Sequence, residues 1–317
     1  MVYKENIAAQ VLFATGGNGV KVKSLFNKRS VLLVLALVFC ACFVWGCKSS
    51  EPAQVNNNAD QAGEKVLVMT GDGLGKASQL TRAEMIKLPD AQFEHVYSII
   101  NNYPTKKKYA ARGVKLSALL KAAGIKDEAK CIAVIGDDGY KSLFTREQLL
   151  ETKRYYFPGV LEGDPAGAEP VEPIIAYEYA ENSDQLSEVR ADDLCLLIPQ
   201  ANVKEQTQHA FVKGIKEIIV SVEDPEKWAA AAVFPQAGLI ARGDTVKLQH
   251  KELGKVKMYY TLDGSAPTEQ STLYNPSTHQ TELTKPIVIE KDTTIKVLVK
   301  GFGKYDSEVA EFRYQVK

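Results

Sequence analysis

The sequence predicts an α+β fold over residues 65–225, followed by an all-β sandwich over residues 234–317. In the first range, apolar strand-like runs alternate with short helical patterns at irregular intervals, which favours α+β over a doubly wound sheet. In the second range, turn residues separate short segments of period-two alternation, and few helical patterns intervene. The 39 basic side chains balance 39 acidic ones, so no field of one sign indicates a nucleic-acid partner.

Residues 1–46 have the pattern of a leader. A basic patch that ends at Arg29 precedes an apolar run over 31–46, and Cys47 follows directly. This order is typical of a secretory signal peptide. Residues 43–47, Phe-Val-Trp-Gly-Cys, resemble a bacterial lipobox, which implies cleavage before Cys47 and acylation of its sulfur. The alternative is an uncleaved transmembrane anchor, for which the run is short because a bilayer core needs roughly 20 residues.

Residues 47–64 are polar and lack apolar periodicity, so they predict a disordered tether between the anchor and the folded part. Beyond Cys47 only Cys131 and Cys195 remain, each inside an apolar strand-like run. An exported protein can form a disulfide from such a pair, and buried free thiols are equally compatible with these surroundings. Both alternatives stay open.

Local patterns define the elements of residues 65–225. Thr81 and Glu84 form a capping box that begins a short helix, and Thr145 with Gln148 repeats this pattern. The leucine spacing over 116–123 predicts a second helix, with Gly124 placed to end it. We expect strands over 65–70, 93–100, 131–135, 174–179, 194–199 and 215–222, and a long loop over 158–173.

Five strands are expected in residues 234–317, over 246–249, 257–261, 287–290, 294–299 and 310–315. Residues 259–268, Tyr-Tyr-Thr-Leu-Asp-Gly-Ser-Ala-Pro-Thr, resemble a signature of the chitobiase/β-hexosaminidase C-terminal domain. The resemblance implies an immunoglobulin-like sandwich. Two functions remain open for it: contact with cell-wall glycan, or a spacer in which Asp263 and Ser265 cap a turn. We favour the spacer, because likeness of fold does not transfer a site.

Four motifs in residues 65–225 follow one another in the order of the molybdopterin-binding domain of the sulfite oxidase family. They are Gly113-Val114-Lys115-Leu116 with its following helix, Asp138-Gly139-Tyr140 with Phe144, Ile174-Ile175-Ala176-Tyr177-Glu178, and Leu196-Leu197-Ile198-Pro199 with Val212-Lys213. This resemblance implies a sulfite-oxidase-type mixed domain. In that family a cysteine thiolate binds molybdenum, since a soft metal takes a soft ligand.

The metal-binding cysteine has no counterpart here. The corresponding segment, residues 96–102, contains no cysteine, and Ser98 offers only a hard oxygen. We therefore expect no metal site, no catalytic residue and no resident cofactor, with molybdopterin as the alternative. The candidate ligand-binding residues are Asn101, Asn102, Tyr140 and Lys213.

These observations predict a lipid-anchored protein at the outer face of the cytoplasmic membrane, in the cell envelope, with a binding or scaffolding role. Its expected partners are the membrane, through the anchor, and cell-wall glycan or another envelope protein, but no nucleic acid. The alternative functions are a molybdopterin-dependent oxidoreductase at the cell surface and a carbohydrate- or wall-binding protein.

Overall fold

The computed structural model describes residues 66–275 and 281–317. Every described residue belongs to one compact unit. The predicted leader, Cys47 and the predicted tether lie outside the described residues. Within the described ranges, no helix has the length and apolar character that crossing a membrane requires.

The predicted α+β class is wrong, because the structure is rich in β-strand: strands account for 45% and helices for 11%. The α-helices are α1 at Arg82–Ile86, α2 at Leu116–Ala122 and α3 at Thr281–Thr284. The other helical segments are the π-helix η1 at Glu147–Glu151 and the 3₁₀ helices η2 at Leu186–Glu188 and η3 at Gln208–Ala210. The helix-start signals were genuine, but each helix ends within about two turns. Helices this short cannot form a layer beside a sheet.

The first sheet has the strand order β2-β1-β11-β5-β6. Its strands are β1 at Val66–Thr70, β2 at Ser78–Thr81, β5 at Cys131–Gly136, β6 at Lys141–Thr145 and β11 at Ile215–Ser221. The β1–β11 pair is parallel, and the other pairs are antiparallel. A parallel neighbour so distant in sequence makes the central strands β1, β11 and β5 depend on contacts across the whole of residues 66–221.

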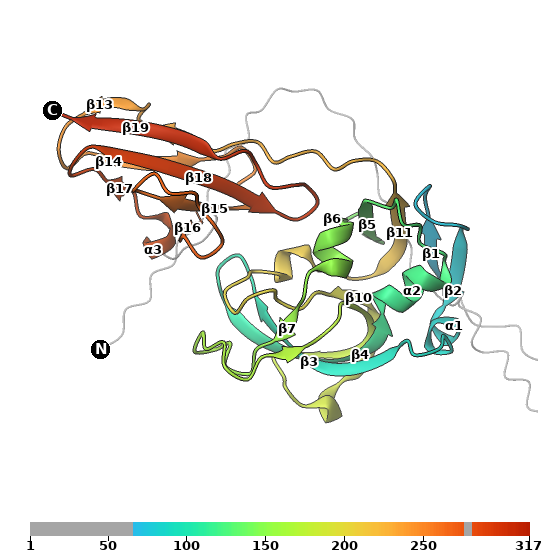
Figure 1. Ribbon diagram of the computed structural model, residues 1–317. Coiled ribbons are helices and arrows are strands. Elements are labelled where there is room, and N and C mark those ends of the chain that lie inside the picture. Colours follow the sequence, from blue (N-terminus) through green and yellow to red (C-terminus); the bar gives the residue numbers. More distant parts are fainter. Residues whose placement is uncertain (1–65, 276–280) are drawn as a thin grey trace, which may run out of the picture. The chain divides into compact units, whose positions relative to one another are not determined.

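The second sheet has the order β10-β9-β4-β3 and is antiparallel throughout. Its strands are β3 at Gln92–Ile100, β4 at Lys106–Lys115, β9 at Ile174–Glu181 and β10 at Arg190–Leu197. The long, curved β3–β4 hairpin is visible in Figure 1. In a short antiparallel pair, β7 at Tyr155–Tyr156 precedes the loop predicted over 158–173, and β8 at Glu169–Pro170 lies within that predicted loop.

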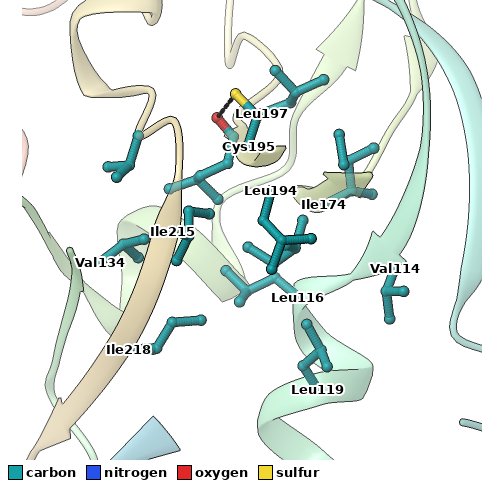
Figure 2. Close-up of a cluster of buried hydrophobic side chains, with 14 of the residues drawn as sticks. Val114, Leu116, Leu119, Val134, Ile174, Leu194, Cys195, Leu197, Ile215 and Ile218 are labelled. Atoms are coloured by element: carbon teal, nitrogen blue, oxygen red, sulfur yellow. Dashed lines mark hydrogen bonds between the residues drawn. The ribbon is translucent and has the colours of Figure 1, made fainter. Parts of the chain in front are cut away.

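One apolar core, here called the first core, joins the two sheets and α2. Figure 2 shows side chains from α2, β5, β10 and β11 meeting in it. The core positions predicted from the sequence pattern are confirmed, since each is fully buried: Leu116, Leu119, Leu120, Ile132, Val134, Leu196 and Ile198. The predicted glycine end of α2 is also confirmed, because Gly124 has a φ of +71°.

A second core lies among residues 228–316 and is built by two further sheets. The three-stranded sheet, in the order β12-β14-β17, contains β12 at Ala232–Phe234, β14 at Thr245–Gln249 and β17 at Ile287–Val288. The five-stranded sheet, in the order β13-β19-β18-β15-β16, contains β13 at Gly238–Ile240, β15 at Val256–Thr261, β16 at Thr272–Tyr274, β18 at Thr293–Gly301 and β19 at Ala310–Val316. Val246 and Leu248 from one sheet share this core with Met258 and Val297 from the other.

Candidate ligand-binding cavity

A cavity of about 570 Å³ lies beside Lys257, and we call it the Lys257 cavity. Three groups of residues line it: the end of β6 with η1 and the residues that follow, the loop over 201–209, and residues of β15, β16 and β18 with their adjoining loops. Its size falls in the range of roughly 300–1,000 Å³ that small-molecule sites occupy. The cavity therefore has room for a metabolite-sized ligand.

Gln148 fixes one wall of the Lys257 cavity. The second predicted capping box is confirmed, because the Thr145 backbone N–H donates to Gln148 Oε1 and the Gln148 N–H donates to Thr145 Oγ1, each at 3.1 Å. The same amide holds the loop after β18: Gln148 Nε2 donates to Gly301 O at 2.9 Å, and Gly303 N–H donates to Gln148 Oε1 at 2.9 Å. A local helix-start signal thus also positions residues far along the chain.

Phe302 packs into the first core's edge at the same wall. Its ring lies edge-on to Phe144 with the centroids 5.4 Å apart, and the His209 ring is 5.6 Å away. Gly303 makes this approach sterically feasible, since its φ is +85° and a Cβ there would lie 2.7 Å from Leu143 O. The loop can approach this closely only with glycine at position 303.

The Arg154 side chain is almost fully buried but has all its partners inside the protein. It donates to Pro199 O at 2.8 Å, to Gln148 O at 2.8 Å and to Glu205 Oε2 at 3.1 Å. Its guanidinium also lies over the Phe302 ring, 5.7 Å from the centroid. Since its donors and its charge are engaged, Arg154 has a structural role in the cavity wall.

Among the described residues, Lys257 bonds to neutral groups. Its Nζ donates to two amide oxygens, Asn102 Oδ1 at 3.0 Å and Asn275 Oδ1 at 3.4 Å, and within the described residues it meets no carboxylate. Burial lowers its pKa to about 8. Three other lining lysines form ion pairs: Lys255 with Glu252, Lys300 with Glu269 and Asp306, and Lys304 with Glu226.

His209 is the second unusual group at the cavity. Burial, and to a lesser degree the charge of Lys257, lowers its pKa to about 4, so the ring is neutral near pH 7. Its Nδ1 is buried and has no hydrogen-bond partner among the described residues. The same holds for three further atoms in this stretch of the chain: Gln200 Oε1, Thr207 Oγ1 and Gln208 Oε1. Buried polar groups are normally bonded, so this concentration in residues 200–209 calls for an explanation.

The sequence-predicted site residues divide into two groups. Asn102 and Tyr140 lie together at a second cavity of about 330 Å³, which shares His209 and Phe302 with the Lys257 cavity. Tyr140 Oη donates to His209 O at 2.5 Å. The other two predicted residues, described next, line neither of these cavities.

Asn101 and Lys213 have structural partners instead. Asn101 Oδ1 accepts the backbone N–H groups of Tyr103 and Thr105, at 2.9 and 2.8 Å, and so shapes its own loop. Lys213 pairs with Glu181 and lies 5.8 Å from the centroid of the Tyr179 ring.

Sequence reasoning missed Lys257 and His209. The period-two alternation of β15 shows only that Lys257 lies on the face opposite the buried Met258. Its partner Asn102 is 155 residues away, so no local pattern could link the two. His209 follows a run of polar residues after Pro199, which resembles an ordinary surface loop.

The residues at 97–102 do not fit a thiolate-bound molybdenum. Ser98 is fully buried, and its Oγ accepts the Phe157 N–H at 3.0 Å, so the hydroxyl serves the fold. The described residues contain no cluster of three or more His, Cys, Asp or Glu side chains suited to a metal.

The two cysteines are free, which decides the open alternative against a disulfide. Cys195 is buried among apolar side chains (Figure 2), and burial raises the pKa of its thiol to about 12. Burial also raises the pKa of Cys131, whose Sγ donates to Glu223 O at 3.5 Å. Neither thiol has the electropositive, partly exposed surroundings that favour a thiolate.

The Asp-Gly-Ser turn of residues 263–265 satisfies its own polar groups. Asp263 Oδ1 accepts the Ser265 N–H at 3.0 Å and the Ser265 hydroxyl at 2.6 Å, while Gly264 has a φ of +77°. Both side chains act in the turn itself.

Comparisons with known proteins find one matching family model and similar solved structures. Residues 246–314 match the family model described as Fn3 associated, and the residues with the chitobiase-like pattern lie inside this match. A search of the curated proteins finds no match. Among solved structures, the sulfane dehydrogenase SoxCD from Paracoccus pantotrophus is similar at 13% identity and a TM-score of 0.33, covering 76% of this chain and 68% of that one.

Proposed function

We propose that the protein is a binding protein of the cell envelope, which takes a small ligand into the Lys257 cavity. The observation that carries this proposal is the coincidence of a ligand-sized cavity with polar groups that have unused hydrogen-bonding capacity. Lys257 and His209 both line the cavity, and neither is fully satisfied by the described residues. The walls are mostly polar and charged, with aromatic surface from Tyr259, Phe302 and Tyr305, and a few polar groups placed in this way orient a small ligand.

The side chains that line the Lys257 cavity support binding more than catalysis. The charged wall residues Arg154 and Lys300 are held by carboxylates and serve as rigid structure. Among the described lining residues, no hydroxyl is bonded to Nδ1 of the His209 ring, so a nucleophile–base pair has no support. A preformed, rigid wall favours affinity because little freedom is lost when a ligand binds.

The envelope location rests on the sequence that ends at Cys47. A lipid on this cysteine would hold the folded part at the outer face of the cytoplasmic membrane, with residues 47–64 as the tether. The satisfied Asp263–Ser265 turn supports a scaffolding role for residues 234–317, beside another envelope protein or the wall.

The test uses the full chain, solubilised in detergent and dialysed against a bacterial metabolite extract. Mass spectrometry then identifies any small molecule retained in proportion to the protein. Ala201→Trp fills the Lys257 cavity, because Ala201 lines it, whereas Ala191→Trp places the same ring on an exposed position of β10. We expect retention by the wild type and Ala191→Trp, and loss in Ala201→Trp. No retained molecule, or equal retention by both variants, would overturn the proposal.

A further inference from the structure

We infer that the ligand of the Lys257 cavity is a small organic anion whose carboxylate accepts a hydrogen bond from Lys257 Nζ. This inference rests on the proposed function and names the chemical class of the ligand. It follows from the hydrogen-bond inventory of Lys257, the distribution of charge in the cavity wall and the side chains around the remaining space.

The Lys257 ammonium has one unused donor. An ammonium carries three N–H groups, and Lys257 uses two of them on Asn102 Oδ1 and Asn275 Oδ1. The third finds no acceptor within the described ranges. Both acceptors are neutral amides, so they supply hydrogen bonds but leave the positive charge without a counterion. An incoming acceptor with a negative charge would satisfy both requirements at once.

The carboxylates that line the wall leave Lys257 without an ion-pair partner among the described residues. Glu205 neutralises Arg154, and Glu269 with Asp306 holds Lys300. The remaining lining carboxylate, Glu147, is exposed. Taking an ammonium out of water is unfavourable unless an opposite charge accompanies it. A carboxylate ligand supplies that charge, and hydrogen bonds between ions of opposite sign are among the strongest in proteins.

The rest of the cavity suits an organic body attached to the carboxylate. Tyr259, Phe302 and Tyr305 contribute aromatic surface to the lining. Neutral His209 adds a ring and an unpartnered Nδ1. An inorganic anion would leave most of about 570 Å³ unfilled, whereas a cyclic carboxylate would use the charge and the aromatic walls together.

The experiment compares benzoate with benzamide, which have similar shapes but differ in charge. Each is titrated calorimetrically into the detergent-solubilised full chain at pH 7. The variants are Lys257→Met, which removes the unpaired charge, and Lys251→Met, which removes an exposed lysine that is not among the residues lining the cavity. We expect the wild type and Lys251→Met to bind benzoate about tenfold more tightly than benzamide, and Lys257→Met to lose this preference.

A second measurement on the wild type does not depend on the folding of a variant. NMR of isotope-labelled lysine follows the titration of the Lys257 amine, and bound benzoate should raise its pKa while benzamide leaves it unchanged. Undetectable benzoate binding, a missing preference for benzoate, or an unchanged preference in Lys257→Met would overturn the inference. If Ala201→Trp still abolished ligand retention while Lys257→Met did not, the proposed binding function would stand and only the anion inference would fall.

Discussion

Asn102 Oδ1 accepts a hydrogen bond from Lys257 Nζ at 3.0 Å, and Asn102 Nδ2 donates to Gly254 O at 3.1 Å. The side-chain amide of Asn102, which follows β3, therefore contacts Lys257 in β15 and also Gly254, just before the start of β15. It orients the ammonium of Lys257 while leaving its charge uncompensated. The consequences for stability and binding can be measured separately.

Lys257 makes the stability of the protein rise with pH in a defined window. Burial lowers its pKa from 10.5 to about 8, so between these values the unfolded chain binds more protons than the folded chain. The destabilising effect of the charge is fully present below pH 8 and is lost as the pH rises towards 10.5. We expect the unfolding free energy of the wild type to gain about 3 kcal/mol relative to Lys257→Met across this window.

Denaturant unfolding at pH 7, 9 and 10.5 measures this difference, and the comparison cancels groups that titrate in both proteins. Lys255→Met serves as the control, because this lysine is exposed and paired with Glu252. It should follow the wild type. Parallel pH profiles for the wild type and Lys257→Met would contradict the prediction.

Leu120→Ala should destabilise the protein by about 2–5 kcal/mol, because Leu120 is fully buried in the first core and its truncation leaves a cavity. Urea unfolding followed by circular dichroism gives the value. Lys121→Ala, at the exposed neighbouring position of α2, should change the free energy by less than about 0.5 kcal/mol. Equal effects at the two positions would show that the buried face of α2 is wrongly assigned.

Gly303→Ala should lower the free energy of unfolding by about 1–3 kcal/mol more than Gly243→Ala does. Both glycines have a φ of +85°, so the left-handed strain is the same. The surroundings differ: a Cβ at Gly303 would lie 2.7 Å from Leu143 O, whereas a Cβ at Gly243 meets nothing within 4 Å. Thermal and denaturant unfolding of the two variants measures how much free energy is lost because a Cβ at position 303 meets Leu143 O. Matching losses would mean that the loop after β18 shifts freely.

Cys47→Ala should abolish incorporation of a fatty-acid label into the chain, since the lipobox-like pattern predicts the lipid on this sulfur. Metabolic labelling with an alkyne fatty acid, read out on a gel, is the measurement. Cys40→Ala is the control: Cys40 lies within the apolar run, and this variant should incorporate the label as the wild type does. Persistent labelling of Cys47→Ala would show that the lipid is carried by another residue and would contradict the predicted acylation of Cys47.

The features predictable from sequence are those fixed by neighbours along the chain. The capping box at Thr81 and Glu84 is present with both of its hydrogen bonds, because the partners are three residues apart. The leucines of α2 are buried because their helical spacing puts them on one face. In both cases the sequence separation itself determines the geometry.

What escaped prediction depends on distant partners. The parallel pairing of β1 with β11 joins the two ends of the 66–221 region, and nothing local marks it. Asn101 and Asn102 are adjacent and chemically identical, yet one completes its own loop and the other reaches Lys257. The α+β expectation failed because helix-start signals state where a helix begins but not how soon it ends.

The double use of Gln148 has a consequence for how the protein opens. Its Oε1 accepts the N–H groups of Thr145 and Gly303, and its Nε2 donates to Gly301 O. Rotation of this single side chain would release the start of η1 and the loop after β18 together. In hydrogen exchange, the amides of Thr145 and Gly303 should therefore behave as members of one cooperative opening unit, although 158 positions separate them. The edge of the first core and the end of β18 are thus thermodynamically coupled through one amide group.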